Sequence, residues 1–286
     1  MIWGGLIFNL LKALSEQIYT TAPAIEISKE EINKNLKNSI VVLPAGGEGT
    51  RIRTLTDDLD INKVLLEIGG GSLIERTITL YRDVGIENFV LLVYFKAESV
   101  RKDLGDGSKL NINITYSEDP GHPAGRGGAI LNAYLNGAIQ SNKTLIIHNP
   151  DDVVINYPGN FPQDMIRTHL QGVKQGTIGT VVVVRGTPHV YSGLTVSKGF
   201  VTDIAMYPFV PIPTHIGITV LEPASRQYFE EMIDLEKKTD FESVILPRLA
   251  SERKLYAFAI PNDSWVAVND LKGVRTLMAA LEREKM

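Results

Sequence analysis

Residues 39–63 read SIVVLPAGGEGTRIRTLTDDLDINK, and the fold of the whole chain can be worked out from this stretch. It begins with residues 39–43, an apolar run rich in β-branched side chains, which is typical of a strand buried on both faces. The run ends at Pro44, and a loop with Gly46, Gly47 and Gly49 follows. Because glycine has no Cβ atom, this loop can turn sharply and come close to a ligand.

The chemistry around the loop indicates which kind of ligand. A loop at the carboxyl end of a strand presents several backbone N–H groups, which form a cradle for phosphate oxygens. Arg51 adds a fork of donors suited to a polyphosphate, and Lys63 adds a compact positive charge. A tight turn that is merely rich in glycine would explain GGxG alone. Together with Thr50, Arg51 and Lys63, the loop favours phosphate binding.

Two common glycine-rich motifs do not fit this loop. A dinucleotide-binding fingerprint, G-x-G-x-x-G, needs Gly or Ala three places after Gly49, where this chain has Ile52. A P-loop needs G-x-x-x-x-G-K-[ST], and no such string occurs in the sequence. These mismatches argue against a nucleotide-dependent oxidoreductase and against a P-loop nucleotidase.

Composition excludes several further classes of protein. The 286 residues allow one large α/β domain or two small ones. A net charge of −4, without a basic stripe, argues against nucleic-acid binding. The absence of cysteine excludes disulfides and thiolate metal sites. No apolar run reaches the ~20 residues of a spanning helix, so we expect a cytoplasmic protein without a membrane span.

The amino-terminal stretch MIWGGLIFNLLKAL is apolar but does not resemble a signal peptide, because it lacks a basic start and a convincing cleavage site. Its apolar residues recur at helical spacing, which predicts an amphipathic helix. We expect this helix to dock on the core of the chain itself, with a membrane or partner contact as the alternative. A polar, charge-rich helix is expected at residues 25–38.

Apolar runs alternate with helical patterns through the rest of the chain. We expect strands at residues 64–69, 89–94, 112–116, 144–148 and 179–184, and helices at residues 73–84, 97–104, 128–139 and 271–283. Ser72 and Glu75 are spaced as a capping box for the first of these helices. Such alternation predicts an α/β fold with a doubly wound, mostly parallel sheet. A hairpin at residues 192–195 and 200–205 indicates a small β-rich side.

The glycine-rich stretch resembles the signature of the sugar-nucleotide pyrophosphorylases, GGxGTRhxPhT followed by PK. The matching residues are Gly46, Gly47, Gly49, Thr50, Arg51, Leu55, Thr56 and Lys63. The chain departs from the signature at Thr54 and Asn62, where the family usually has proline. These proteins are sugar-1-phosphate nucleotidyltransferases with a Rossmann-like fold. The resemblance implies a single nucleotidyltransferase domain at residues 39–286, and residues 1–38 are expected to form a helical extension, about whose amino-terminal helix the resemblance says nothing.

The resemblance also implies roles for individual residues. Arg51 and Lys63 would be catalytic, acting on the leaving pyrophosphate and on the α-phosphate. The nucleotide would contact Ala45, Gly46, Gly47, Gly49, Thr50 and Gly128. Gly128 belongs to a second glycine-rich segment, residues 118–129, which resembles the family's E-x-x-x-G-T-A-G-A but has Arg126 in place of threonine. A simple start of a helix is the alternative for this segment.

Two residues are predicted to bind magnesium. Asp151 comes just after the expected strand at 144–148, where open α/β sheets bind their ligands, and resembles the aspartate of the family's N-G-D. Asp152 is the competing choice. Near the carboxyl end, residues 265–270 resemble the family's second metal-binding segment, with Asn269 as the ligand and Asp270 as the fallback. Carboxylate and amide oxygens both suit Mg²⁺. The predicted cofactor is therefore Mg²⁺.

The acceptor side matches the family least well. Gly193 fits its F-G-x-x segment, and Gly217 fits its N-x-G, with His215 in place of asparagine. The family's E-K-P, whose lysine contacts the sugar phosphate, corresponds to residues 206–208, Met-Tyr-Pro. Another cation must then serve the acceptor phosphate, or the acceptor differs. His215, His189 and Lys198 are candidates by location only.

We therefore predict Mg²⁺-dependent transfer of a nucleotidyl group from a nucleoside triphosphate to a sugar 1-phosphate. The alternative is a weak or inactive regulator that binds a nucleotide or sugar nucleotide on the same fold. The partners would be the nucleoside triphosphate and a phosphorylated sugar or polyol, without nucleic acid. The sequence leaves open the nucleobase, the acceptor and the oligomeric state, for which a homo-oligomer is one candidate.

Overall fold

The structure is a computed structural model of the chain that describes residues 13, 16, 25–56 and 59–284. Apart from position 13, the amphipathic helix expected at residues 1–14 lies outside the described residues. Among the described residues, no helix is long and apolar enough to cross a membrane.

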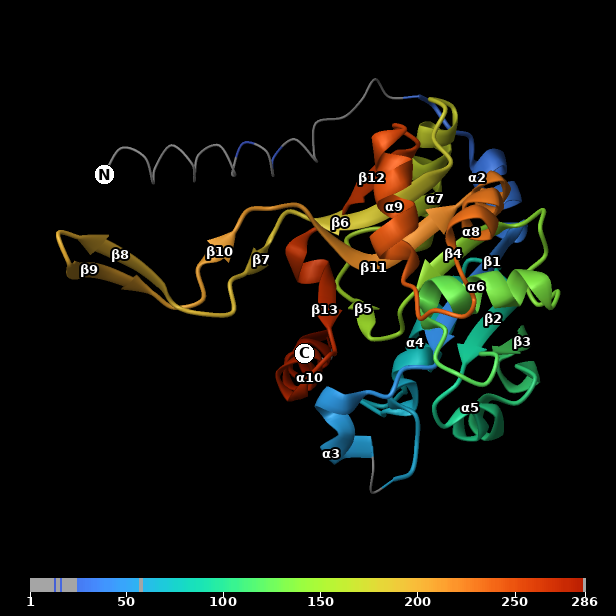
Figure 1. The fold of residues 1–286 in the computed structure, drawn as a ribbon, viewed down its shortest axis with the longest axis horizontal. Coiled ribbons are helices and arrows are strands. Elements are labelled where there is room, and N and C mark those ends of the chain that lie inside the picture. Colours follow the sequence, from blue (N-terminus) through green and yellow to red (C-terminus); the bar gives the residue numbers. More distant parts are fainter. Residues whose placement is uncertain (1–12, 14–15, 17–24, 57–58, 285–286) are drawn as a thin grey trace.

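A seven-stranded sheet forms the centre of the molecule, in the order β12-β6-β11-β4-β1-β2-β3 (Figure 1). These strands are β1 (Ser39–Ala45), β2 (Asn88–Val93), β3 (Asn113–Glu118), β4 (Thr144–His148), β6 (Gly179–Val184), β11 (Thr214–Leu221) and β12 (Leu255–Ala259). All neighbours run parallel except β11, which is antiparallel to both β4 and β6. The predicted doubly wound, mostly parallel α/β fold is confirmed.

Helices cover both faces of the sheet. One face carries α2 (Lys29–Lys37), α4 (Leu73–Arg82), α5 (Ala97–Leu104) and α7 (Phe161–Val173), and the other carries α6 (Gly125–Leu135), α8 (Arg226–Met232) and α9 (Phe241–Ser251). Along β1, Val41 and Leu43 point to the first core, while Ile40 and Val42 point to the second. This alternation explains why the strand is apolar from Ile40 to Leu43.

Three small strand pairs lie outside the main sheet. β5 (Asp152–Val154) pairs with β13 (Trp265–Ala267), β7 (Thr187–Pro188) pairs with β10 (Phe209–Val210), and β8 (Gly193–Ser197) pairs with β9 (Phe200–Ala205). The last two pairs form an arm, residues 187–210, that extends away from the body (Figure 1). The predicted hairpin is confirmed as β8 and β9. The chain ends in α10 (Leu271–Glu284), which packs beside β13.

Local signals near helix starts are mostly confirmed. Ser72 and Glu75 form the expected capping box, with the Glu75 amide 3.2 Å from the Ser72 hydroxyl. The expected strand at residues 64–69 is wrong: residues 63–65 form a 3-10 turn, and only an isolated bridge joins Glu67 to Ser72. The Asn62 side chain caps this turn, so the segment folds back instead of joining the sheet. The helix expected at residues 128–139, in the second glycine-rich segment, is α6, and it begins at Gly125, three residues before the expected start.

Candidate active site

The glycine-rich loop follows β1 and packs against two neighbours. Gly49 has φ of +59°, the left-handed region that favours glycine. A Cβ atom there would also lie 3.0 Å from the Cβ of Lys63, and one on Gly46 would lie 3.2 Å from the Cβ of Tyr94. The glycines therefore allow the loop to bend and to lie directly against the Lys63 side chain.

A cleft of about 710 Å³ opens beside this loop. Its walls include Gly46, Gly47, Gly49 and Thr50 from the loop, with Gly125 and Arg126 from the start of α6. Two of the predicted nucleotide contacts, Ala45 and Gly128, adjoin these walls but do not line the cleft. Ala45 is buried in the sheet, and Gly128 faces inward, where a Cβ atom would lie 2.8 Å from that of Ala124. A separate cleft of about 680 Å³ near α4 and α7 contains none of the predicted site residues.

Lys63 forms an ion pair with Asp151, the predicted metal ligand. The side chains are 20% and 12% exposed, so the pair is largely shielded from water. Asn62, which is fully buried, fixes the start of the turn that carries Lys63. Its side-chain amide donates to the carbonyl oxygens of Ala45 and Phe95, at 2.9 and 2.6 Å. This anchoring role was missed from the sequence, where Asn62 was noted only as a departure from proline.

Asp151 lies between β4 and β5, next to the strand that leads to Asn269. The carbonyl oxygen of Asp151 accepts a 2.7 Å hydrogen bond from the amide of Val268, and Asn269 comes next in the chain. The fallback ligand, Asp270, is engaged in a local role: its carboxylate accepts the amide of Gly273 at 2.8 Å in the first turn of α10. The structure thus brings the segments of Asp151 and Asn269 together.

Asp152, the competing choice, is also held by neighbours. Its carboxylate accepts hydrogen bonds from the indole of Trp265 at 3.0 Å and from the amide of Asn149 at 3.3 Å. Burial, together with the charge of neighbouring Asp151, raises the pKa of Asp152 to about 7 despite these two bonds. Its backbone carbonyl accepts from the buried ring of His148 at 2.8 Å. The carboxylate of Asp152 is therefore held by two neighbouring side chains, whereas that of Asp151 is paired with Lys63.

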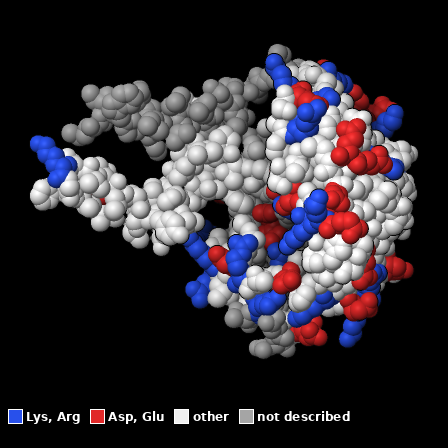
Figure 2. Space-filling model, viewed as in Figure 1, with Lys and Arg blue, Asp and Glu red and all other residues white. Residues whose placement is uncertain are grey.

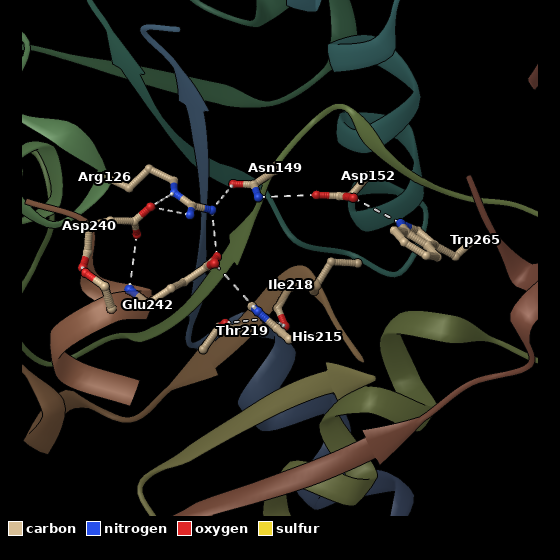
Figure 3. A network of polar contacts seen from close by, with 10 residues as sticks. Arg126, Asn149, Asp152, His215, Ile218, Thr219, Asp240, Glu242 and Trp265 are labelled. Atoms are coloured by element: carbon tan, nitrogen blue, oxygen red, sulfur yellow. Dashed lines mark hydrogen bonds and ion pairs between the residues drawn. The ribbon is translucent and has the colours of Figure 1, made fainter. Parts of the chain in front are cut away.

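A polar network joins this aspartate region to the cleft (Figure 3). Arg126 pairs with Asp240 and Glu242 at the start of α9, and its guanidinium lies 3.4 Å from the Asn149 side chain. Burial alone would lower the pKa of Arg126, but the two carboxylates outweigh it and raise that pKa. Asn149 in turn contacts Asp152. From the sequence, Arg126 stood out only because it takes the place of the family's threonine. Its two acidic partners were not predicted.

Comparison with known proteins identifies the family of this chain. Residues 40–283 match the family model described as nucleotidyl transferase. The chain belongs to this family. It is 28% identical over 247 residues to a probable mannose-1-phosphate guanylyltransferase 2 of Oryza sativa, covering 83% of this chain and 64% of the relative. It is 26% identical to the mannose-1-phosphate guanylyltransferase catalytic subunit beta of Drosophila melanogaster, covering 82% and 60%.

The chain therefore spans less than two thirds of the length of these curated relatives. Among solved structures, it is similar to a putative glucose-1-phosphate thymidylyltransferase from Bacillus anthracis, with a TM-score of 0.63 and 15% identity over 84% of this chain and 94% of that one. HddC from Yersinia pseudotuberculosis gives a TM-score of 0.58 with 21% identity, over 86% and 99%. At such identities, the likeness concerns the fold.

The donor set of this nucleotidyl transferase suits magnesium. No group of three or more His, Asp or Glu side chains in the described residues could hold a metal ion by itself. Mg²⁺, however, is usually bound through one or two carboxylates, with substrate phosphates and waters as its other ligands. The shielded carboxylate of Asp151 beside the Asn269 segment fits that pattern. To hold the metal, Asp151 would give up its ion pair with Lys63.

The predicted acceptor residues fall into two groups. Gly217, with φ of +71°, lies against the aspartate loop, and a Cβ atom there would be 2.2 Å from a carboxylate oxygen of Asp152. His215 contacts Thr219 at 3.1 Å and faces Glu242 at 3.8 Å, and burial lowers its pKa. Gly193 lies in the arm, where it packs against Pro208. The structure brings His215 and Gly217 to the site region and leaves Gly193 in the arm.

Proposed function

We propose that this nucleotidyl transferase joins a nucleoside triphosphate to a sugar 1-phosphate, giving a nucleoside diphosphate sugar and pyrophosphate. The observation that carries the proposal is the shielded Lys63–Asp151 pair directly beneath the glycine-rich loop. Such a placement sets a cation and a metal-binding carboxylate beside the cleft whose loop suits phosphates. A site that only bound nucleotides would have less need of this pair.

In this reaction, an oxygen of the acceptor phosphate attacks the α-phosphorus of the triphosphate. The new P–O bond forms as the bond to the β-phosphate oxygen breaks, and pyrophosphate leaves in line. No covalent intermediate with a side chain is required, so catalysis depends on positioning and charge stabilisation. The chain contains no cysteine, so it has no thiol to act as a nucleophile.

The chain's own residues then have separate tasks. The backbone of the loop from Gly46 to Thr50 holds the triphosphate, and Arg51, exposed at the loop's end, neutralises the leaving pyrophosphate. Lys63 stabilises charge at the α-phosphate once substrate releases it from Asp151. Asp151 and Asn269 would hold Mg²⁺, which supplies further charge neutralisation when bound.

For the substrates, the relatives named mannose-1-phosphate guanylyltransferase support GTP and mannose 1-phosphate as the first pair to test. The assay is release of pyrophosphate from each of four nucleoside triphosphates with a panel of sugar 1-phosphates, in the presence of Mg²⁺. We expect release with one pair, with GTP and mannose 1-phosphate as the leading pair. Silence across the panel would refute the proposal.

A binding-only regulator is the second candidate. It is favoured by Ala267, which occupies an aspartate position of one family variant, and by the absent E-K-P. It predicts that GTP or a sugar nucleotide binds while no acceptor triggers pyrophosphate release.

We also propose that the protein is cytoplasmic and forms a homo-oligomer. Size-exclusion chromatography with light scattering tests the oligomeric state.

A further inference from the structure

The cations near Asp151 are mostly paired. Lys63 pairs with Asp151, and Arg126 pairs with Asp240 and Glu242. In the described part of the chain, Lys272 forms no ion pair; its ammonium group lies over the ring of Tyr207, 5.0 Å from the centroid. It is therefore a cation whose charge is not neutralised by the protein.

Lys272 is closely tied to the strand beside Asp151. It precedes Gly273, which packs so tightly on that strand that a Cβ atom would lie 2.2 Å from the carbonyl oxygen of Ala267. Val268, the residue just after that strand, donates its amide to the backbone carbonyl of Asp151 at 2.7 Å. The start of α10 is thus fixed to the backbone of the predicted metal ligand.

The Lys272 side chain extends from this position to the arm, where it meets Tyr207 between the two strand pairs. Tyr207 lies between β9 and β10, in the segment that corresponds to the family's E-K-P but contains no charge. Lys272 therefore brings a cation from α10 to a segment that lacks one of its own. Figure 2 shows Lys and Arg side chains gathered beside the hollow between the arm and the body, over the region of α10 and α3 (Arg53–Thr56).

Stability does not explain a lysine at this place. Lys272 is exposed, and it lies in the first turn of a helix, near the positive end of the helix dipole. That turn itself has no acidic residue, and the carboxylate of Asp270, just before it, accepts the amide of Gly273 and forms no ion pair with Lys272 in the described part of the chain. A cation–π contact at an exposed site contributes only modestly to folding. An anion from outside the chain would give the charge a partner.

We propose that Lys272 binds the phosphate of the acceptor, with the Tyr207 ring holding its ammonium group in place. The inference rests on the proposed function, whose acceptor is a phosphate monoester. Lysine binds phosphate as a compact point charge, so a single flexible side chain suffices. In this chain, the cation for the acceptor comes from the helix at the carboxyl end and not from the segment after β9.

The test compares Lys272→Ala with wild type in the pyrophosphate-release assay, varying mannose 1-phosphate and GTP separately. Because a hydrogen bond to a charged group is stronger than a neutral one, we expect the KM for mannose 1-phosphate to rise roughly tenfold or more. The KM for GTP should stay within about twofold, since the triphosphate binds at the glycine-rich loop. Lys272→Arg should restore part of the affinity.

Arg275→Ala is the matched control, because Arg275 is an exposed cation on the same helix, one turn away. An equal rise in the KM for mannose 1-phosphate in both variants, or no rise in Lys272→Ala, would overturn the inference while leaving the proposed function intact. Unchanged circular dichroism and GTP binding exclude a folding defect in each variant.

Calorimetric titration separates this inference from the proposed function. Mannose 1-phosphate is titrated into the wild type and into Lys272→Ala, each with Mg²⁺ and a non-hydrolysable GTP analogue. Binding that depends on Lys272, without turnover in wild type, supports the inference and refutes the transferase. If the wild type neither binds nor turns over mannose 1-phosphate or any other sugar 1-phosphate of the panel, both proposals fail.

Discussion

Replacing Asn62 with alanine should destabilise the chain and disturb Lys63 together. The Asn62 side chain is fully buried and forms three hydrogen bonds: it donates to the carbonyl oxygens of Ala45 and Phe95 and accepts the amide of Val64 at 3.1 Å. Alanine removes all three and leaves their backbone partners without this side chain. At about 1 kcal/mol for each bond, the free energy of unfolding should fall by about 3 kcal/mol.

Urea unfolding measures this loss, and thermal melting should show a fall in Tm of roughly 6–12 °C. Asn160→Ala is the control, because Asn160 also caps a helix but is exposed and accepts a single bond, from Gln163 at 3.1 Å. The free energy of unfolding of Asn160→Ala should fall by only about 1 kcal/mol. Equal losses in the two variants, or a stable Asn62→Ala, would refute the reasoning.

Asn62→Pro sharpens the test, since proline is the residue that the family usually has at this position. The backbone φ of −70° at Asn62 is compatible with proline. However, the backbone N–H of Asn62 donates to the Ser99 hydroxyl at 3.0 Å, and proline has no backbone N–H. We expect Asn62→Pro to be no more stable than Asn62→Ala. A proline variant as stable as wild type would show that the turn does not depend on these hydrogen bonds.

Three further predictions concern the site. Lys63→Ala should lower the rate of pyrophosphate release by ~10²-fold or more, with GTP binding retained, and wild-type turnover would exclude its role. Gly217→Ala should abolish release, because its Cβ atom would collide with Asp152, whereas Gly176→Ala has open space and should affect only stability. Removing Mg²⁺ with a chelator should stop release and adding it back should restore it; release in excess chelator would contradict the metal assignment. Burial lowers the pKa of His148 from 6.5 to about 4, so the unfolded chain binds a proton there that the folded chain does not. Stability should be full above pH 6.5 and fall by about 3 kcal/mol as the pH drops through 4, with a shallower fall in His148→Gln measured by urea unfolding.

The ring of His148 shows how tertiary contacts set the chemistry of a buried group. A carbonyl oxygen can only accept, so the bond to the Asp152 carbonyl places the proton on Nε2. The other ring nitrogen, Nδ1, then accepts the hydroxyl of Tyr81 at 2.9 Å. Nothing in β4, the strand that ends at His148, indicates this partner, because Tyr81 is 67 residues away in the chain.

The sequence by itself determined the frame of the molecule. The apolar runs that became β1, β2, β4 and β6 were predicted closely, because burial on both faces requires a nearly continuous apolar run. The capping box at Ser72 and the glycine-rich loop were likewise predicted, since each depends on residues a few places apart. The family that these local patterns resemble agrees with the match of residues 40–283 to the nucleotidyl transferase model.

Only the tertiary structure decided how distant residues meet. The partner of Lys63 lies 88 positions away, and that of Arg126 lies 114 positions away. The expected strand at residues 64–69 failed for the same reason, because the buried Asn62 side chain ties the turn to the end of β1 at Ala45 and to Phe95, which follows β2. Local patterns record which residues must be buried or must turn, whereas the pairing of charges depends on the positions that the packed sheet gives to them.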